Sequence, residues 1–249
     1  MIKREKIDGL VLSRRNVGEA DRILTLFTAN KGLIKVMAKG VRVVPSRRGS
    51  NIEPFTEILM IVSGNEGRYW LTAVETKDYF QELHEDQEGL MRAHFLARAI
   101  VGLFHPEEPQ GHIYEAVRDS WKIWPSCRGG QGPMLEVALY LMLLRAAGYQ
   151  PELKSCRVCG RVRAEETIVL DERLGGWVCI TCRSSLAEAN HSITTDGLRV
   201  IKYLAEKPNL ALRLAVDDRL GQQLEEAMRK YVGGVVEAQW RGALVKDLR

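Results

Sequence analysis

Hydrophobic and polar residues alternate in short runs over the first eighty positions, the pattern of β-strands with one buried face. Turn-forming segments such as Asn16-Val17-Gly18-Glu19 separate these runs. Five short strands in about 80 residues favour a small closed barrel, because closure removes the exposed edges of the sheet. An OB-fold is the best match and an SH3-like barrel is the alternative. The expected strands cover residues 7–14, 22–28, 32–39, 55–61 and 69–75.

After residue 80 the apolar residues recur at steps of three and four, which predicts amphipathic helices. One of them is apolar on nearly all sides and should therefore be buried, with Gly148 at its C-terminal end. Thr194 or Thr195 can cap a later helix, and Gly233-Gly234 should break the last one. The predicted helices cover residues 84–104, 113–124, 134–147, 195–206 and 217–232, with helical character resuming over 235–247.

Four of the five cysteines form two C-x-x-C pairs, Cys156 with Cys159 and Cys179 with Cys182, separated by nineteen residues. Two residues between thiols allow a tight turn to direct both sulfurs at one tetrahedral ion, and the spacer is long enough for a hairpin. This spacing predicts one structural Zn²⁺. Four thiolates leave no coordination position for water, so a zinc hydrolase is disfavoured. A redox dithiol is the alternative, but no βαβ pattern surrounds either pair.

Basic residues surround the first cysteine pair, namely Lys154, Arg157, Arg161 and Arg163. They could contact phosphate groups. Because Glu165 and Glu166 follow directly, a solvated surface is an equally good interpretation.

These patterns predict an α+β multidomain protein: an N-terminal five-stranded OB-fold barrel, then an α-helical domain with an inserted four-cysteine zinc ribbon. The expected boundaries are 1–80 for the nucleic-acid-binding OB-fold, 81–152 for the first part of the helical domain, 153–190 for the zinc module, and 191–249 for the C-terminal helical part.

Composition and charge narrow the functional class. The chain has 36 basic and 32 acidic residues, a net charge of +4. Residues 1–50 hold twelve basic and four acidic side chains, or +8, which leaves −4 for the remainder. The longest apolar run has eight residues, far below the about 20 that a membrane helix needs, and no secretory leader is visible. We therefore expect a cytoplasmic protein with no membrane partner.

The positive charge concentrates on one predicted strand and the loop after it. Side chains alternate along a strand, so Lys35 and Lys39 share one face, about 13 Å apart, while the opposite face is apolar. Single-stranded nucleic acid needs such a basic track together with stacking surfaces. Phe27, Phe55, Tyr69 and Trp70 are candidate stacking residues, although each is also a candidate core residue. The predicted DNA contacts are Arg14, Lys31, Lys35, Lys39, Arg42, Arg47 and Arg48.

Motifs of the common enzyme classes are missing. The chain has no G-x-x-x-x-G-K-[ST] phosphate loop, no H-E-x-x-H, no G-x-S-x-G, and no H-x-E upstream of a Pro-Cys-x-x-Cys. We therefore expect no catalytic residues and no enzymatic activity.

Several segments give the chain its resemblance to the RecO family of bacterial DNA repair and recombination mediators. The resemblance extends from the barrel to the terminal helices. Many members have lost some of the cysteines, whereas this chain has all four. The matching segments are Asp8-Gly9-Leu10-Val11-Leu12, Glu19-Ala20-Asp21-Arg22-Ile23-Leu24-Thr25-Leu26-Phe27-Thr28, Lys31-Gly32-Leu33, Ala38-Lys39-Gly40, Glu53-Pro54-Phe55, and Leu144-Arg145-Ala146-Ala147-Gly148-Tyr149-Gln150-Pro151 before Cys156-x-x-Cys159-Gly160.

The resemblance implies a DNA repair and homologous recombination mediator that is nucleoid-associated. Such a protein binds single-stranded DNA, and double-stranded DNA as well, and anneals complementary strands without ATP. It engages RecR and the C-terminal tail of the single-strand-binding protein, and indirectly helps to load RecA. The tail is expected to bind the helical domain around 90–104 and 134–144. The loop 42–48 is less uniformly basic than in many relatives.

Two other functional classes stay open at this stage. One is a metal-dependent nucleic-acid-modifying enzyme with an unrecognised carboxylate site. The other is a zinc-ribbon protein that binds only protein partners.

Overall fold

The computed structural model describes residues 4–42, 52–65, 67–162, 167–183 and 192–246. The chain forms two compact units. The first contains Met1–Ala97 and Phe104–Ser126, and the second contains Arg98–Leu103 and Cys127–Arg249.

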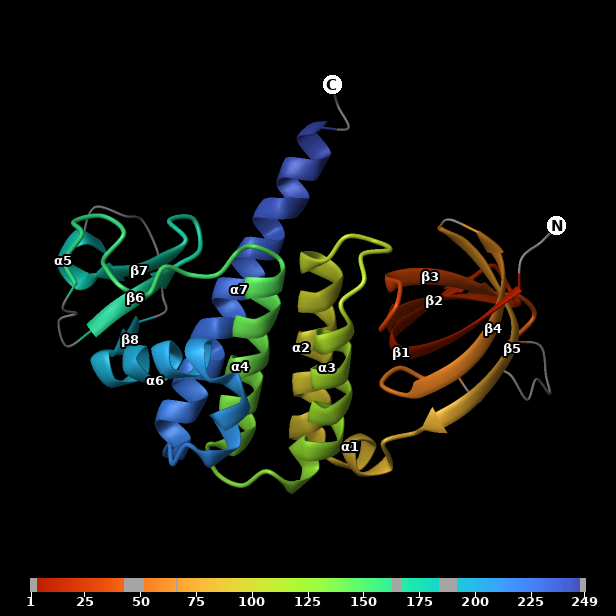
Figure 1. Cartoon of the computed structure of the whole chain (residues 1–249), viewed down its shortest axis with the longest axis horizontal. Helices are drawn as coiled ribbons and strands as arrows, with labels where there is room; N and C mark the ends of the chain where they lie inside the picture. Colours follow the sequence, from red (N-terminus) through yellow and green to blue (C-terminus); the bar gives the residue numbers. More distant parts are fainter. Residues whose placement is uncertain (1–3, 43–51, 66, 163–166, 184–191, 247–249) are drawn as a thin grey trace. The chain divides into compact units, whose positions relative to one another are not determined.

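Five strands form a closed barrel in the first unit, in the order β1-β2-β3-β5-β4 (Figure 1). All neighbouring strands are antiparallel except β3 and β5, which are parallel. The five predicted strands and the expected OB-type barrel are confirmed, and most strands extend beyond the predicted limits. The strands are β1 (Arg4–Val17), β2 (Asp21–Thr28), β3 (Gly32–Ala38), β4 (Glu57–Asn65) and β5 (Arg68–Asp78).

Alternation along the strands places the apolar residues inside the barrel. On β3, Ile34, Val36 and Ala38 are buried, as expected, while Lys35 is exposed and Met37 is half-buried. Aliphatic side chains from all five strands complete this core, so its stabilisation comes mainly from the removal of apolar surface from water.

The seam between β3 and β5 closes the barrel, and it is short. Only two residue pairs join these strands, Val36 with Tyr69 and Met37 with Trp70. A loop that follows helix α2 (Gln87–Leu103) covers the seam beyond these pairs: the backbone N–H of Glu107 donates to the Leu33 carbonyl (3.0 Å). The Glu107 carboxylate accepts from the Gly67 N–H (2.7 Å) and from the Tyr69 hydroxyl (2.8 Å). The loop therefore links β3 and the start of β5.

Gly32 allows this loop to approach. Its φ is +58°, and a Cβ built there would lie 1.9 Å from the carbonyl oxygen of Glu108. Both the left-handed backbone and the close backbone contact require glycine.

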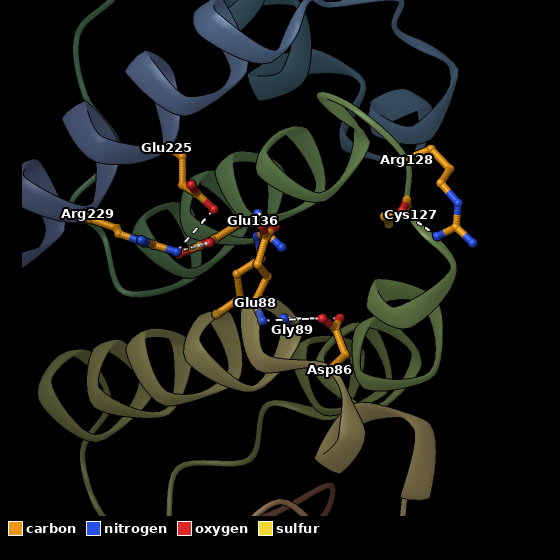
Figure 2. A network of polar contacts seen from close by, with 9 residues as sticks. Asp86, Glu88, Gly89, Cys127, Arg128, Glu136, Glu225 and Arg229 are labelled. Carbon is orange, nitrogen blue, oxygen red and sulfur yellow. Dashed lines mark hydrogen bonds and ion pairs between the residues drawn. The ribbon is translucent and has the colours of Figure 1, made fainter.

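Short helices follow the barrel in the first unit. They are α1 (Gln81–Glu85), the start of α2 (Gln87–Leu103), α3 (Gly111–Ile123) and the 3₁₀ turn η2 (Trp124–Ser126). The predicted helix over 84–104 is confirmed as α2, but it begins only at Gln87, because the chain breaks at Asp86. The Asp86 carboxylate accepts hydrogen bonds from the N–H groups of Glu88 (3.2 Å) and Gly89 (3.1 Å), which caps the start of α2 (Figure 2).

Helix α4 (Gln131–Ala146) is central in the second unit and packs against α6 (Thr195–Glu206), the 3₁₀ segment η3 (Pro208–Arg213) and α7 (Asp218–Lys246). As expected, α4 is buried and Thr194 caps α6, its hydroxyl accepting from the Gly197 N–H (3.1 Å). A small sheet in the order β7-β6-β8 completes the unit. It consists of β6 (Thr167–Asp171), β7 (Gly176–Cys179) and β8 (Ser192–Thr194), with the helical turn α5 (Ile180–Arg183) after β7.

The predicted break at Gly233-Gly234 is wrong, because α7 is continuous over both glycines. A Cβ at Gly234 would lie 2.3 Å from Cγ of Glu172. Glycine at this position permits the close approach of the segment after β6 and does not end the helix.

A buried ion cluster joins α4 to α7 (Figure 2). The Arg229 guanidinium donates from Nε and Nη2 to the two carboxylate oxygens of Glu136, both at 2.7 Å, and also contacts Glu225 at 3.0 Å. Glu136 is fully buried. Burial raises the pKa of Glu136 to about 7, against the opposing effect of Arg229.

We predict that Gly32→Ala destabilises the protein by about 2 kcal/mol or more, because the left-handed backbone alone costs roughly 1–2 kcal/mol and the loop must also move. Gly40→Ala is the matched control, with φ of +68° and nothing within 4 Å of the added Cβ. Urea unfolding measures both. Equal losses in the two variants would contradict the proposed contact.

We also predict that Arg229→Met lowers stability by about 3–5 kcal/mol at pH 8, since it leaves Glu136 buried and charged without its partner. Without Arg229, the folded-state pKa of Glu136 rises further above its unfolded value. The penalty should therefore shrink as the pH falls and the carboxyl group takes up a proton. Adding Glu136→Gln should restore part of the loss at pH 8. A pH-independent loss would contradict this assignment.

Candidate metal centre and nucleic-acid interface

The four paired cysteines lie together in the second unit. Their sulfur atoms all lie within 4.8 Å of one another. The Sγ of Cys179 is 3.7 Å from that of Cys156 and 3.7 Å from that of Cys159. A tetrahedral zinc with bonds of about 2.3 Å would place its sulfurs about 3.8 Å apart. The cluster therefore has the dimensions of a four-thiolate metal site.

The local backbone conformation directs the four sulfur atoms toward one another. The first pair lies in a tight turn in which the Gly160 N–H donates to the Cys156 carbonyl (3.0 Å), with Gly160 at φ +72°. The Cys179 N–H donates to Sγ of Cys156 (3.4 Å). Cys179 ends β7 and Cys182 lies on α5, so the short helical turn directs the second pair toward the first.

The proximity of the thiols changes their acidity. Burial opposes ionisation of Cys179, but hydrogen bonds from Thr181 and Cys182 prevail and lower its pKa to about 6. Hydrogen bonding to Cys179 and Cys159 raises the pKa of Cys182 to about 12. The sulfurs compete for negative charge, and a bound cation would relieve this competition by stabilising all four thiolates.

The predicted DNA contacts on β3 lie on the outer surface of the barrel. Lys35 is exposed on the strand, and Lys39 is exposed directly after it. Neither forms an ion pair with a residue in the described ranges. Met37 lies between them on the same face.

Strand pairing extends this face across the barrel. Met37 pairs with Ile23 on β2 and with Trp70 on β5. Trp70 is 40% exposed, whereas Phe27, Phe55 and Tyr69 are at most 5% exposed. Of the four candidate stacking residues, only Trp70 therefore offers a ring to solvent. The cross-strand row runs through Arg15, Ile23, Met37 and Trp70 and continues to Ser63 and Arg4.

The buried aromatic residues serve the packing of the first unit. The ring of Phe27 stacks on Phe104 with centroids 6.1 Å apart. The ring of Phe55 meets Trp121 edge-on at 5.6 Å. These contacts join the barrel to the helical segments of the same unit.

Arg14 and Arg42 lie near one another at the end of the barrel where β1 turns into β2. Arg14 forms an ion pair with Glu53, and the Arg42 guanidinium donates to the Gly18 carbonyl (2.9 Å). Arg22, which the sequence reasoning missed, joins them. Partial burial and the nearby cations Arg14 and Arg42 lower the pKa of Arg22, although Glu53 opposes this.

Lys31 directly precedes β3. Its ammonium group is 3.2 Å from the Glu5 carboxylate and 5.8 Å from the centroid of the Tyr69 ring. Partial burial lowers its pKa, but Glu5 and Tyr69 outweigh that effect and raise it. The structure thus places Lys35 on β3 with Lys39 directly after it, and Arg14 with Arg42 near the turn from β1 to β2, and it pairs Lys31 and Arg14 with carboxylates. Arg47 and Arg48 lie outside the described residues.

Arg15 and Arg22 were not among the predicted contacts. Both could have been found from the alternation on β1 and β2, since Arg15 faces outward beside Ile23, and Arg22 pairs with Asn16 near the turn. Only the pairing of β3 with β5 identifies Trp70 as the exposed aromatic residue of this face. That pairing joins segments that are distant in the sequence, so no local pattern reveals it.

In the part of the chain that the structure describes, no helix is both long and apolar enough to cross a membrane.

Comparisons with known proteins cover nearly the whole chain. Residues 1–80 match the family model described as Recombination protein O N terminal, and residues 84–241 match Recombination protein O C terminal. Curated relatives are named DNA repair protein RecO. One from Roseiflexus sp. (strain RS-1) is 25% identical over 247 residues, covering 98% of this chain and 86% of the relative. One from Rubrobacter xylanophilus is 30% identical over 238 residues, covering 94% and 92%. One from Thermobifida fusca is 32% identical over 183 residues, covering 71% and 72%.

Proposed function

The chain belongs to the RecO family of DNA repair and recombination proteins, and from this premise we propose that it binds single-stranded DNA across the outer face of its barrel. The observation that carries the proposal is the exposed Trp70 ring beside Met37, with Lys35 and Lys39 on either side along β3. A ring of this kind can stack on a base while the lysines contact phosphates.

The spacing on β3 suits a strand of DNA. Lys35 and Lys39 are four residues apart, about 13 Å along the strand, which is close to two phosphate repeats of an extended strand. Met37 and Ile23 supply an apolar surface between the charges. Arg22 and Arg42 at one end of the barrel, together with Arg47 and Arg48, are the proposed continuation of the phosphate track. Arg14 and Lys31 are the weaker candidates, because Glu53 and Glu5 already pair with them.

We propose that the protein acts in the cytoplasm as a non-catalytic recombination mediator. It anneals complementary strands without ATP, in line with the missing phosphate loop in the sequence. It also binds double-stranded DNA, RecR and the C-terminal tail of the single-strand-binding protein, and so helps to load RecA onto coated strands. Family membership supports these partners.

The cysteine cluster is proposed to bind one structural Zn²⁺ through Cys156, Cys159, Cys179 and Cys182. The sulfur separations of 3.7 Å support a tetrahedral four-thiolate shell. The ion would fix the turns that carry both pairs. It would stabilise the fold and catalyse no reaction, because four thiolate ligands leave no coordination position for water or substrate.

For the barrel, we predict that Lys35→Ala with Lys39→Ala reduces the slope of log affinity against log salt by about 1.4, since each lost phosphate contact contributes roughly 0.7. Trp70→Ala should weaken binding by about 1–3 kcal/mol with an unchanged slope, because stacking releases no counterions. Fluorescence anisotropy of a labelled oligothymidylate at several salt concentrations measures both effects.

The matched control for the lysine pair is Lys6→Ala with Lys122→Ala, two exposed cations of the first unit outside the predicted set, of which Lys122 lies by Asp78 at the end of β5 away from Trp70. This control should keep a steep slope. If it lowers the slope as much as the β3 variant does, the assignment to β3 is wrong.

For the metal site, we predict one zinc per chain in the purified protein and none in Cys179→Ser, measured by elemental mass spectrometry. Loss of zinc should unfold the module, as ligation contributes on the order of 10 kcal/mol in small zinc modules. Cys127→Ser removes the fifth cysteine and should keep one zinc. A zinc-free wild-type protein with a cooperatively folded β6–β7 sheet would contradict the proposal.

A further inference from the structure

A cavity of about 640 Å³ that is open to solvent lies within the second unit. The end of α4, the segment before the first cysteine pair, and α6 form its walls. Four basic side chains line it against two acidic ones, Glu152 and Glu206. The basic residues are Arg145, Lys154, Arg157 and Lys202.

The cations come from separate segments, so their convergence is a property of the fold. Arg145 lies in the last turn of α4 and Lys202 on α6, while Lys154 precedes the cysteine pair. None of these three forms an ion pair with a residue in the described parts of the chain. A concave surface with excess charge of one sign concentrates the electric field and attracts ions of the opposite sign.

Backbone contacts hold the cavity wall in place. The Arg157 side chain donates from Nε to the Leu174 carbonyl (2.9 Å), which leaves both terminal NH₂ groups of its guanidinium for other acceptors. The Glu152 carboxylate accepts from the Lys154 N–H (2.6 Å), and the Glu152 N–H donates to the Gly175 carbonyl (2.8 Å). Glu152, one of the two acidic residues, is therefore hydrogen-bonded within the cavity wall.

We propose that this cavity is a second DNA site, which holds the phosphodiester backbone of a nucleic-acid strand. The inference rests on the proposed function of the barrel. Two guanidinium groups and two ammonium groups suit phosphate oxygens, which accept paired hydrogen bonds from arginine. Several lining residues, among them Gln150, are exposed, so a polymer can reach the cavity and continue past it.

A second site has a direct use in annealing. A protein that holds one strand on its barrel and a phosphate backbone in its other unit raises the local concentration of the two strands. The excess of two positive charges in the lining provides affinity without sequence readout, as annealing of arbitrary strands requires.

The test uses the full-length, zinc-loaded protein with Arg145→Gln and Lys202→Gln, two substitutions away from the cysteines. The control is Arg213→Gln with Arg219→Gln, which removes the same charge from exposed positions of the same unit outside the cavity. With a labelled oligothymidylate, the cavity variant should lose roughly eightfold in affinity per lost contact at 50 mM salt, and its salt slope should fall by about 1.4. The control should change far less.

A photoreactive amino acid at position Gln150 supplies an independent measurement. It should cross-link to the oligothymidylate in the wild-type background, and the cross-link should weaken in the cavity variant. The single variants Arg145→Gln and Lys202→Gln replace the double variant if thermal melting shows that it does not fold.

Equal affinities for the cavity and control variants, with no cross-link at position 150, would overturn the second site while leaving the barrel proposal intact. A cross-link to an acidic peptide but not to the oligonucleotide would overturn it as well. Absence of any DNA binding by the wild-type protein would overturn the proposed function and this inference together.

Discussion

The closure of the barrel between β3 and β5 is the constraint on which the proposed binding face depends. Four of the five strand contacts are antiparallel ladders, but this one is a parallel contact of only two residue pairs. The loop at Glu107 completes it by hydrogen bonding to both sides of the seam. Because a closed barrel has no free edge, this short seam also covers the edges of β3 and β5, which could otherwise pair with a strand of another chain.

The same seam determines which aromatic residue faces the solvent. Tyr69 and Trp70 are consecutive on β5, so they must point to opposite sides of the sheet. Pairing with Val36 turns Tyr69 toward the interior and its hydroxyl to Glu107, while pairing with Met37 places Trp70 outside, between the β3 lysines. A shift of one residue would exchange these roles and remove the stacking ring from the basic strand.

The sequence allowed the prediction of local features. Alternation identified the strands, including the buried face of β3 and the exposed Lys35, and the cysteine spacing identified the cluster that the structure brings within 4.8 Å. Features that depend on distant contacts could not be predicted. The close approach of Glu172 explains why residue 234 is a glycine inside a helix, and Phe27 is buried because Phe104 stacks on it. The convergence of Arg145 with Lys202 likewise depends on the packing of α4 against α6.

The tryptophan indole signals of the ¹⁵N-labelled protein give the most direct test of the central claim. The chain has five tryptophans, of which Trp121, Trp124 and Trp177 are fully buried. Titration with a short oligothymidylate should shift or broaden the signal that Trp70→Phe identifies as that of Trp70, while the signals of the three buried indoles stay in place. Saturation of the protein with DNA and an unchanged Trp70 signal would contradict a binding face on β3 and β5.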